Sequence, residues 1–201
     1  MLVDLSVPLN ERTPVYPGDP QTTIRSNGIL AKDGYEDHFV CVGTHVGTHI
    51  DAPRHMIEGG KTLDQIPIEQ FSGRGVYVKV EGVFDLDKVK KAPIQAGDIV
   101  VFHTNMSDLY DQSEYHESYP VITEDIARDL AGKNIKMIGV DMCSPDKEPF
   151  PVHKILLGSE ILIIENLTNL GTLAGKEFKI FAFPIKLTLD GAPARVIAEL
   201  S

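Results

Sequence analysis

The sequence predicts a single α/β domain with a mixed β-sheet and few helices. The chain has 201 residues, 42% of them hydrophobic, which is enough for one substantial core. Short apolar runs of strand-forming residues recur along it, and only one stretch has a clear helical pattern. The chain contains no repeat, low-complexity segment or linker, so residues 1–201 are expected to form one domain.

Short runs rich in aliphatic side chains predict the strands of the sheet. Several of these runs are apolar throughout, which is typical of strands that are covered on both faces. In chain order, the predicted strands are residues 2–7, 75–80, 98–103, 136–141, 160–165 and 179–183.

Residues 123–130 carry the clearest helix signal. Thr123 suits the N-cap position, acidic residues fill the first turn, and Gly132 lies just past the end. Shorter helical turns are expected at 63–71 and 152–157. Two stretches without clear periodicity, 10–19 and 104–120, are predicted to be long loops, which are either lids over a site or surface excursions.

Three histidines and one aspartate lie close together between Gly43 and His55, in a stretch broken by glycine and proline. Their spacing is His45-x3-His49-x-Asp51-x3-His55. Imidazole nitrogens and a carboxylate oxygen are ligands that zinc, manganese and iron(II) accept. No single helical face carries the set, and an extended strand would hold its ends too far apart. We therefore expect the stretch to fold back on itself around a metal ion.

The charge and the cysteines limit the other classes of function. A net charge of −10 and a pI near 5.1 argue against nucleic-acid or anionic-membrane partners and favour a small-molecule substrate. The chain has no apolar run of membrane-spanning length, and its start lacks the pattern of a signal peptide, so we predict a cytoplasmic protein. Cys41 and Cys143 lack a metal or redox spacing and are expected to be ordinary buried thiols.

The cluster and several later segments resemble one known family. The string His45-Val-Gly-Thr-His49-Ile-Asp51-Ala-Pro-Arg-His55 resembles the H-x-G-T-H-x-D-x-P-x-H signature of the cyclase family, which includes bacterial kynurenine formamidase and isatin hydrolase. The resemblance covers nearly the whole chain. It continues in Tyr16-Pro-Gly-Asp, in residues 139–146, in His153 and Glu165, and in residues 190–195.

The resemblance implies a ligand set and a fold. His45, His49 and Asp51 would hold one divalent metal, and Asp51, His153 and Glu165 would hold a second one, with Asp51 bridging. Taken alone, His153 would be interpreted as a surface histidine and Glu165 as an ion-paired carboxylate. Two zinc ions are expected, with manganese as the alternative. The family's fold is a swivelling β/β/α domain, and its subunits pair, so we expect a homodimer or homotetramer in which a partner's loop helps to line the pocket.

The function predicted on this basis is hydrolysis of a small linear or cyclic amide, such as an aryl formamide or a lactam-like ring. A divalent metal generates hydroxide from water near neutral pH and polarises the carbonyl. His55 matches the family's proton-transfer histidine and would act as the proton shuttle, although it could instead be a plain ligand. Two other classes remain open, namely a mononuclear iron(II) enzyme that uses oxygen and a non-catalytic metal-binding or ligand-binding homologue.

The sequence offers few candidates for substrate recognition. Tyr16 stands where bacterial kynurenine formamidases carry a tryptophan that lies at the substrate pocket, and this chain contains no tryptophan. A tyrosine can still stack on an aryl ring, so Tyr16 is the predicted substrate contact. Arg54 either recognises a substrate carboxylate or points to solvent. Arg195 is expected to pair with a buried carboxylate.

Overall fold

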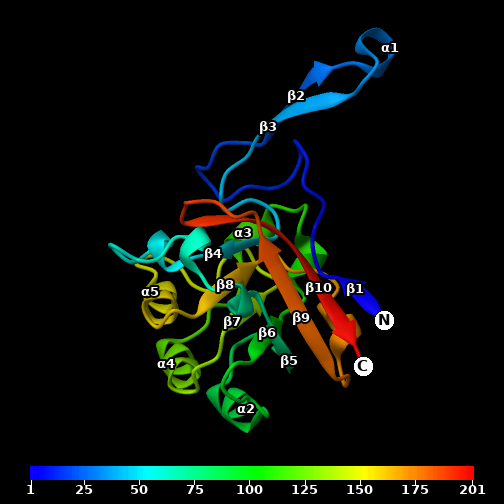
Figure 1. Cartoon of the computed structure of the whole chain (residues 1–201). Helices are drawn as coiled ribbons and strands as arrows, with labels where there is room; N and C mark the ends of the chain where they lie inside the picture. The colour runs from blue at the N-terminus through cyan, green and yellow to red at the C-terminus, as the bar shows by residue number, and fades with distance from the viewer.

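The computed structural model describes residues 1–201, and its body is a closed ring of β-strands with helices on the outside (Figure 1). Eight strands follow the order β1-β10-β4-β8-β7-β6-β5-β9, and an additional pairing of β9 with β10 joins the two ends, so that all strands but β1 form the ring. The strands are β1 (Leu2–Asp4), β4 (His49–Asp51), β5 (Ser72–Lys79), β6 (Ile99–His103), β7 (Met137–Val140), β8 (Leu162–Glu165), β9 (Phe178–Pro184) and β10 (Gly191–Leu200).

The sheet is mixed, and its parallel part is built from crossover units. Strands β5, β6, β7 and β8 are parallel neighbours, whereas β4, β9, β10 and β1 pair antiparallel. The connections between the parallel strands carry helices α2 (Leu86–Lys91), α4 (Glu124–Gly132) and α5 (Pro151–Gly158). Because the strands run in one direction, their carboxyl ends meet at one edge, which is where such sheets bind ligands.

Two hydrophobic cores lie on opposite faces of the same strands. Side chains alternate along a strand, so Val100 and Phe102 pack under the helices while Ile99 and Val101 fill the inside of the ring. The four residues of β7 and the four of β8 are all buried. This confirms the prediction of strands that are covered on both faces.

The predicted α/β class with a mixed sheet and few helices is confirmed, and each predicted strand has a counterpart. The N-cap of α4 is also as predicted, since the Thr123 side chain accepts a hydrogen bond from the amide of Ile126. The helical turns expected at 63–71 are two 3₁₀ segments, η2 (Leu63–Gln65) and η3 (Ile68–Phe71). The sequence pattern did not predict β4, α2 and β10 or the two strands β2 (Thr23–Gly28) and β3 (Asp37–Cys41).

The expected loop at 104–120 is more ordered than predicted. It contains a 3₁₀ segment, η4 (Met106–Leu109), and a short helix, α3 (Glu114–Glu117). Tyr115 of α3 is fully buried, and its hydroxyl donates to the side-chain oxygen of Asn166 at 2.6 Å. This segment is therefore packed against the body, and the alternative of a solvated surface excursion is wrong.

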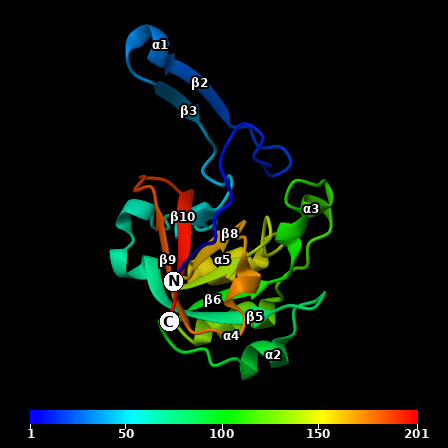
Figure 2. The ribbon, with the colours of Figure 1, turned by 90° about the vertical axis from the view of Figure 1, so that its right-hand side faces the viewer.

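A two-stranded hairpin stands away from the body (Figure 2). It consists of β2 (Thr23–Gly28) and β3 (Asp37–Cys41), with the short helix α1 (Leu30–Asp33) between them. All five residues of β3 are exposed. The prediction of two buried thiols is therefore wrong for Cys41, which is exposed at the end of β3, and right for Cys143. None of the helices is long and apolar enough to cross a membrane.

Candidate metal centre

Strand β4 carries the centre of the candidate site. Residues two apart on a strand share a face, so His49 and Asp51 point the same way while Ile50 between them fills the ring interior. Gly47, with φ of 63°, allows the tight turn that leads into the strand. In the register with β8, His49 lies directly opposite Glu165. The pairing of β4 with β8 thus brings together two ligand candidates that are far apart in the sequence.

The ends of the His45–His55 stretch fold back over β4. His45 lies in the turn before the strand, and its Nδ1 is 2.7 Å from Oδ1 of Asp51. His55 ends a 3₁₀ segment, η1 (Pro53–His55), and its ring centroid lies 3.9 Å from that of His45. The predicted folding back is observed, although part of the stretch is a strand of the main sheet, which was not predicted.

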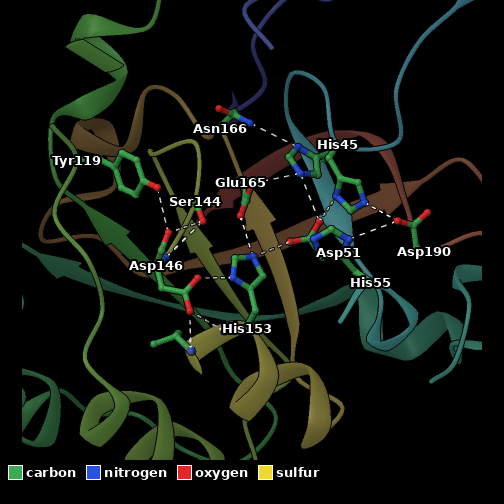
Figure 3. Close-up of polar contacts among 12 residues, drawn as sticks. His45, Asp51, His55, Tyr119, Ser144, Asp146, His153, Glu165, Asn166 and Asp190 are labelled. Atoms are coloured by element: carbon green, nitrogen blue, oxygen red, sulfur yellow. Dashed lines mark hydrogen bonds and ion pairs between the residues drawn. The ribbon is translucent and has the colours of Figure 1, made fainter. Parts of the chain in front are cut away.

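His153 reaches the same place from helix α5 (Figure 3). Its Nε2 is 3.4 Å from Oε1 of Glu165 and 3.8 Å from Oδ2 of Asp51. The other oxygen of Glu165 lies 3.3 Å from Nε2 of His49. His153 is 3% exposed and Glu165 6%, so the alternative of a surface histidine is wrong.

The donor atoms form two groups that share Asp51. One is His45, His49 and Asp51, and the other is Asp51, His153 and Glu165; within each group the donor atoms lie within 4.8 Å of one another. Nε2 of His49 and Oδ2 of Asp51 are buried without any hydrogen-bond partner. Buried polar atoms are costly unless they bind something, so this donor set suits divalent cations.

Second partners orient the rings of two histidines. Nδ1 of His49 lies 2.8 Å from the carbonyl oxygen of Gly47, and Nδ1 of His153 lies 2.5 Å from Oδ1 of Asp146. When Nδ1 donates to these acceptors, the Nε2 lone pair of each ring points into the site, as a metal ligand requires. Asp146 also accepts from the amides of Val152 and His153. Asp146 therefore both orients the His153 ring and caps the start of α5.

Neighbouring carboxylates raise the pKa values of three histidines in the cluster, so protons compete with a metal ion for these rings. Burial alone would lower the pKa of His45, but the Asp51 charge and the hydrogen bond with Asp190 raise it to about 9. Burial is outweighed in the same way at His49, where Asp51 and Glu165 raise the pKa to about 10. At His153, Asp146 and Glu165 also raise the pKa to about 10 against burial. A cation that binds here must displace these protons, so binding strengthens as pH rises.

His55 differs from the other histidines of the cluster. Its pKa is lowered, because burial and the neighbouring His45 and His153 outweigh the attraction of the Asp51 and Glu165 charges. It belongs to neither of the two groups that share Asp51. The side chain is 24% exposed and faces the pocket. A neutral imidazole in this position can accept a proton.

A pocket of about 230 Å³ opens over the cluster. His45, His55, His153 and Glu165 form its polar floor, and the remaining lining residues are Tyr16, Asp19, Met56, Cys143, Ser144 and Phe150. Tyr16 lies at the mouth, 36% exposed, with its ring edge-on to that of His116. Burial raises the pKa of the Cys143 thiol to about 12, so this cysteine is not a nucleophile.

Two arginines also had predicted roles. Arg54 is exposed and does not line the pocket, which favours the solvent alternative. Arg195 pairs with Asp4, whose side chain is 43% exposed, so the expectation of a buried partner is wrong. Thr48 bonds backbone groups of Val7 and Asn166. Asp141 accepts from the backbone of Thr104 and Asn105 and does not touch His153.

Asp190 also belongs to the cluster, although the sequence did not predict a role for it. Its Oδ2 lies 2.8 Å from Nε2 of His45 and 3.4 Å from Nδ1 of His55. The available signal was its place at the start of the 190–195 run that carries the family resemblance. Only the pairing of β10 with β4 brings it to the histidines.

Comparison with known proteins identifies the family. A family model described as "Putative cyclase" matches residues 3–147. The chain belongs to the cyclase family. It is 35% identical over 189 residues to an uncharacterized protein of Methanocaldococcus jannaschii, with 92% of each chain covered. It is also 28% identical to a kynurenine formamidase of Bacillus cereus, with 97% of this chain and 95% of the relative covered.

Solved structures of cyclase-family proteins share the fold. One described as a potential metal-dependent hydrolase with cyclase activity has a TM-score of 0.82 and 32% identity, covering 98% of this chain and 96% of the other. An isatin hydrolase bound to thioisatinate has a TM-score of 0.90 at 23% identity, covering 100% of this chain and 92% of the other, and supports the fold alone. The predicted class, a metal-dependent hydrolase of this family, agrees with these relatives.

Proposed function

We propose that this protein is a metal-dependent hydrolase that cleaves a carbon–nitrogen bond in a small linear or cyclic amide. The observation that carries the proposal is the pair of donor groups sharing Asp51 directly beneath a pocket that also holds a neutral histidine. The similarity to a kynurenine formamidase supports an aryl formamide as substrate. A lactam-like ring, the cyclic amide predicted from the sequence, is the second candidate.

The donor set fits two divalent ions. His45, His49 and Asp51 would hold the first, and His153 and Glu165 would hold the second together with Asp51. Bound there, the ions would act as Lewis acids that lower the pKa of water and polarise a carbonyl oxygen. Zinc is the proposed metal, because tetrahedral zinc sites combine histidine with carboxylate ligands, and manganese is the alternative.

The proposed task of His55 is to move the proton. Since its pKa is lowered by burial, the ring is neutral near pH 7 and takes a proton as the nucleophile forms. It then returns that proton to the leaving nitrogen, which would otherwise depart as a poor anionic leaving group. Tyr16 and Phe150 provide aromatic surface in the pocket on which a planar substrate can stack.

The test is an activity screen of zinc-loaded and manganese-loaded protein against aryl formamides, isatin-like lactams and cyclic imides. His55→Ala should keep the metal content of the wild type and lose turnover by roughly 10²–10⁴-fold, the usual contribution of a general acid–base group. Loss of metal in this variant would make His55 a ligand and remove the shuttle. An assay without oxygen separates hydrolysis from iron(II) oxygen chemistry. Full metal occupancy without turnover on any substrate would favour the non-catalytic alternative.

We also propose that two copies pair through the hairpin of β2 and β3. The hairpin leaves the body and exposes large apolar side chains, which isolated surfaces seldom do. The residues concerned are Ile29, Leu30, Tyr35, Phe39 and Val40. A homodimer in which each hairpin covers the partner would bury them and could place a partner residue at the pocket mouth. A homotetramer of such pairs is the larger alternative, and the cytoplasm remains the predicted location.

A further inference from the structure

Asp190 contacts two histidines to which different tasks are proposed. Its Oδ2 is 2.8 Å from Nε2 of His45, a ligand candidate, and 3.4 Å from Nδ1 of His55, the candidate proton carrier. Figure 3 shows the three side chains together at one side of the cluster. The second distance is long for a hydrogen bond. The other carboxylate oxygen has no role toward His45, so a small rotation of the side chain would offer it to His55.

The backbone around Asp190 is held firmly. The carbonyl oxygen of Asp190 accepts from the amide of Ala52 at 2.8 Å, and Gly191 and Ala192 pair with Asp51 and Ile50 in the next strand. The carboxylate is therefore attached at the junction of two strands, one of which carries Asp51 and His49. A residue on rigid strands can fix a neighbouring ring better than a residue on a loop.

Gly191 provides the room that this contact needs. A Cβ atom at this position would lie 2.7 Å from Cε1 and 3.1 Å from Nε2 of His45, and 3.0 Å from the carbonyl oxygen of Ile50. The His45 ring thus rests directly on the glycine backbone while its Nε2 meets the preceding carboxylate. Asp190 and Gly191 therefore act together. The glycine leaves room for the His45 ring, and the Asp190 carboxylate accepts the hydrogen bond from Nε2 of that ring.

We propose that Asp190 is a positioning residue that orients both the metal ligand His45 and the proton carrier His55. Nδ1 of His45 faces Asp51 at 2.7 Å, so this nitrogen is the one available to a cation, and Nε2–H donates to Asp190. The arrangement is the carboxylate–histidine–metal pattern. The same carboxylate accepts from Nδ1–H of His55 and leaves Nε2 of that ring without a proton and free to receive one. The inference rests on the proposed function.

His45, His55 and Asp190 could also be read as a third cation site, because their donor atoms lie within 4.8 Å of one another. That reading requires His45 to bind one cation at each nitrogen, which means a fully deprotonated ring. A neutral imidazole has only one nitrogen free to bind. The geometry therefore favours the carboxylate as an acceptor of two hydrogen bonds.

The experiment compares Asp190→Ala and Asp190→Asn with Asp4→Asn, in zinc-loaded protein. Asp4→Asn is the matched control, since it removes an ion pair with Arg195 of strand β10 and neither residue lines the pocket. We expect nitrogen-15 NMR to show His55 as the Nδ1–H tautomer in the wild type and the control, and as the Nε2–H tautomer in Asp190→Ala. Zinc affinity, measured by competition with a chelator, should fall by about 10–100-fold.

Turnover supplies the second readout. We expect kcat to fall by about 10–100-fold in Asp190→Ala with KM within about twofold, and by less in Asp190→Asn, whose amide oxygen still accepts a hydrogen bond. An unchanged His55 tautomer together with wild-type zinc affinity would overturn the inference. So would a third zinc ion in the wild type that is lost in Asp190→Ala. A wild type without amidase activity would instead refute the proposed function, and the tautomer shift would still support the positioning role.

Discussion

Replacing Gly191 by alanine should displace His45 and weaken metal binding. The added Cβ would lie 2.7 Å from Cε1 of His45, where ordinary van der Waals contact begins at 3.4 Å. The carbonyl of Ile50, 3.0 Å away, belongs to strand β4 and cannot retreat without breaking the sheet. The His45 ring must therefore move by about 0.7 Å, whereas metal–ligand distances tolerate only about 0.2 Å.

The expected loss in zinc affinity is about 10–100-fold, which corresponds to about 1.4–2.8 kcal/mol. Competition with a chelator of known affinity measures it directly. Overpacking should also cost the metal-free protein about 1–3 kcal/mol of unfolding free energy. Gly132→Ala is the matched control, because a Cβ at that helix position meets nothing within 4 Å. Wild-type zinc affinity in Gly191→Ala would refute the assignment of His45 as a ligand.

Three further predictions concern His153, the protonated histidines of the cluster and the hairpin. Asp146→Ala removes the carboxylate that accepts hydrogen bonds from the His153 ring and from two amides at the start of α5. We expect loss of the second zinc ion, measured by metal analysis, and a loss of about 1–3 kcal/mol of unfolding free energy, measured by thermal unfolding. The metal-free protein should be most stable near pH 6.5 and lose roughly 5–10 °C in melting temperature by pH 10. The reason is that the pKa values of His45, His49 and His153 are raised from 6.5 to about 9, 10 and 10. A melting temperature that does not change with pH would contradict this. Phe39→Asp in the hairpin should turn the dimer into a monomer in light scattering, whereas the control Val83→Asp, at an exposed apolar residue outside the hairpin, should not. Dimers in both variants would locate the interface elsewhere.

The sign of the pH prediction follows from proton binding. The folded, metal-free state holds protons on these histidines that the unfolded chain releases near 6.5. The stabilisation is therefore complete below pH 6.5 and disappears as pH rises through 9 to 10. With saturating zinc, the stability should instead rise with pH up to neutral pH, because the metal replaces the protons on these histidines.

The central strands and the helix at Thr123 were predictable because their signals are local. Continuous aliphatic runs bounded by polar residues identify β6, β7 and β8, and a capping threonine before acidic residues identifies α4. The histidine spacing around His49 likewise predicted a metal cluster, and the family resemblance extended it to His153 and Glu165. All of these side chains lie together in the structure.

What could not be predicted depends on pairing between distant segments. Strand β4 has only three residues and reads as a glycine-rich loop, since its strand character comes from its neighbours β8 and β10. Asp190 becomes relevant only because β10 brings it to His45 and His55. The hairpin strands expose both faces and so lack the alternation that identifies a half-buried strand.

The most direct test of the two-metal centre is the number and place of metal ions in zinc-loaded crystals, located by anomalous scattering at the zinc edge. We expect two ions in each chain, one on His45 and His49 and the other on His153 and Glu165, with Asp51 bound to both. A single ion on His45, His49 and Asp51, with His153 and Glu165 turned away from it, would contradict the two-metal centre.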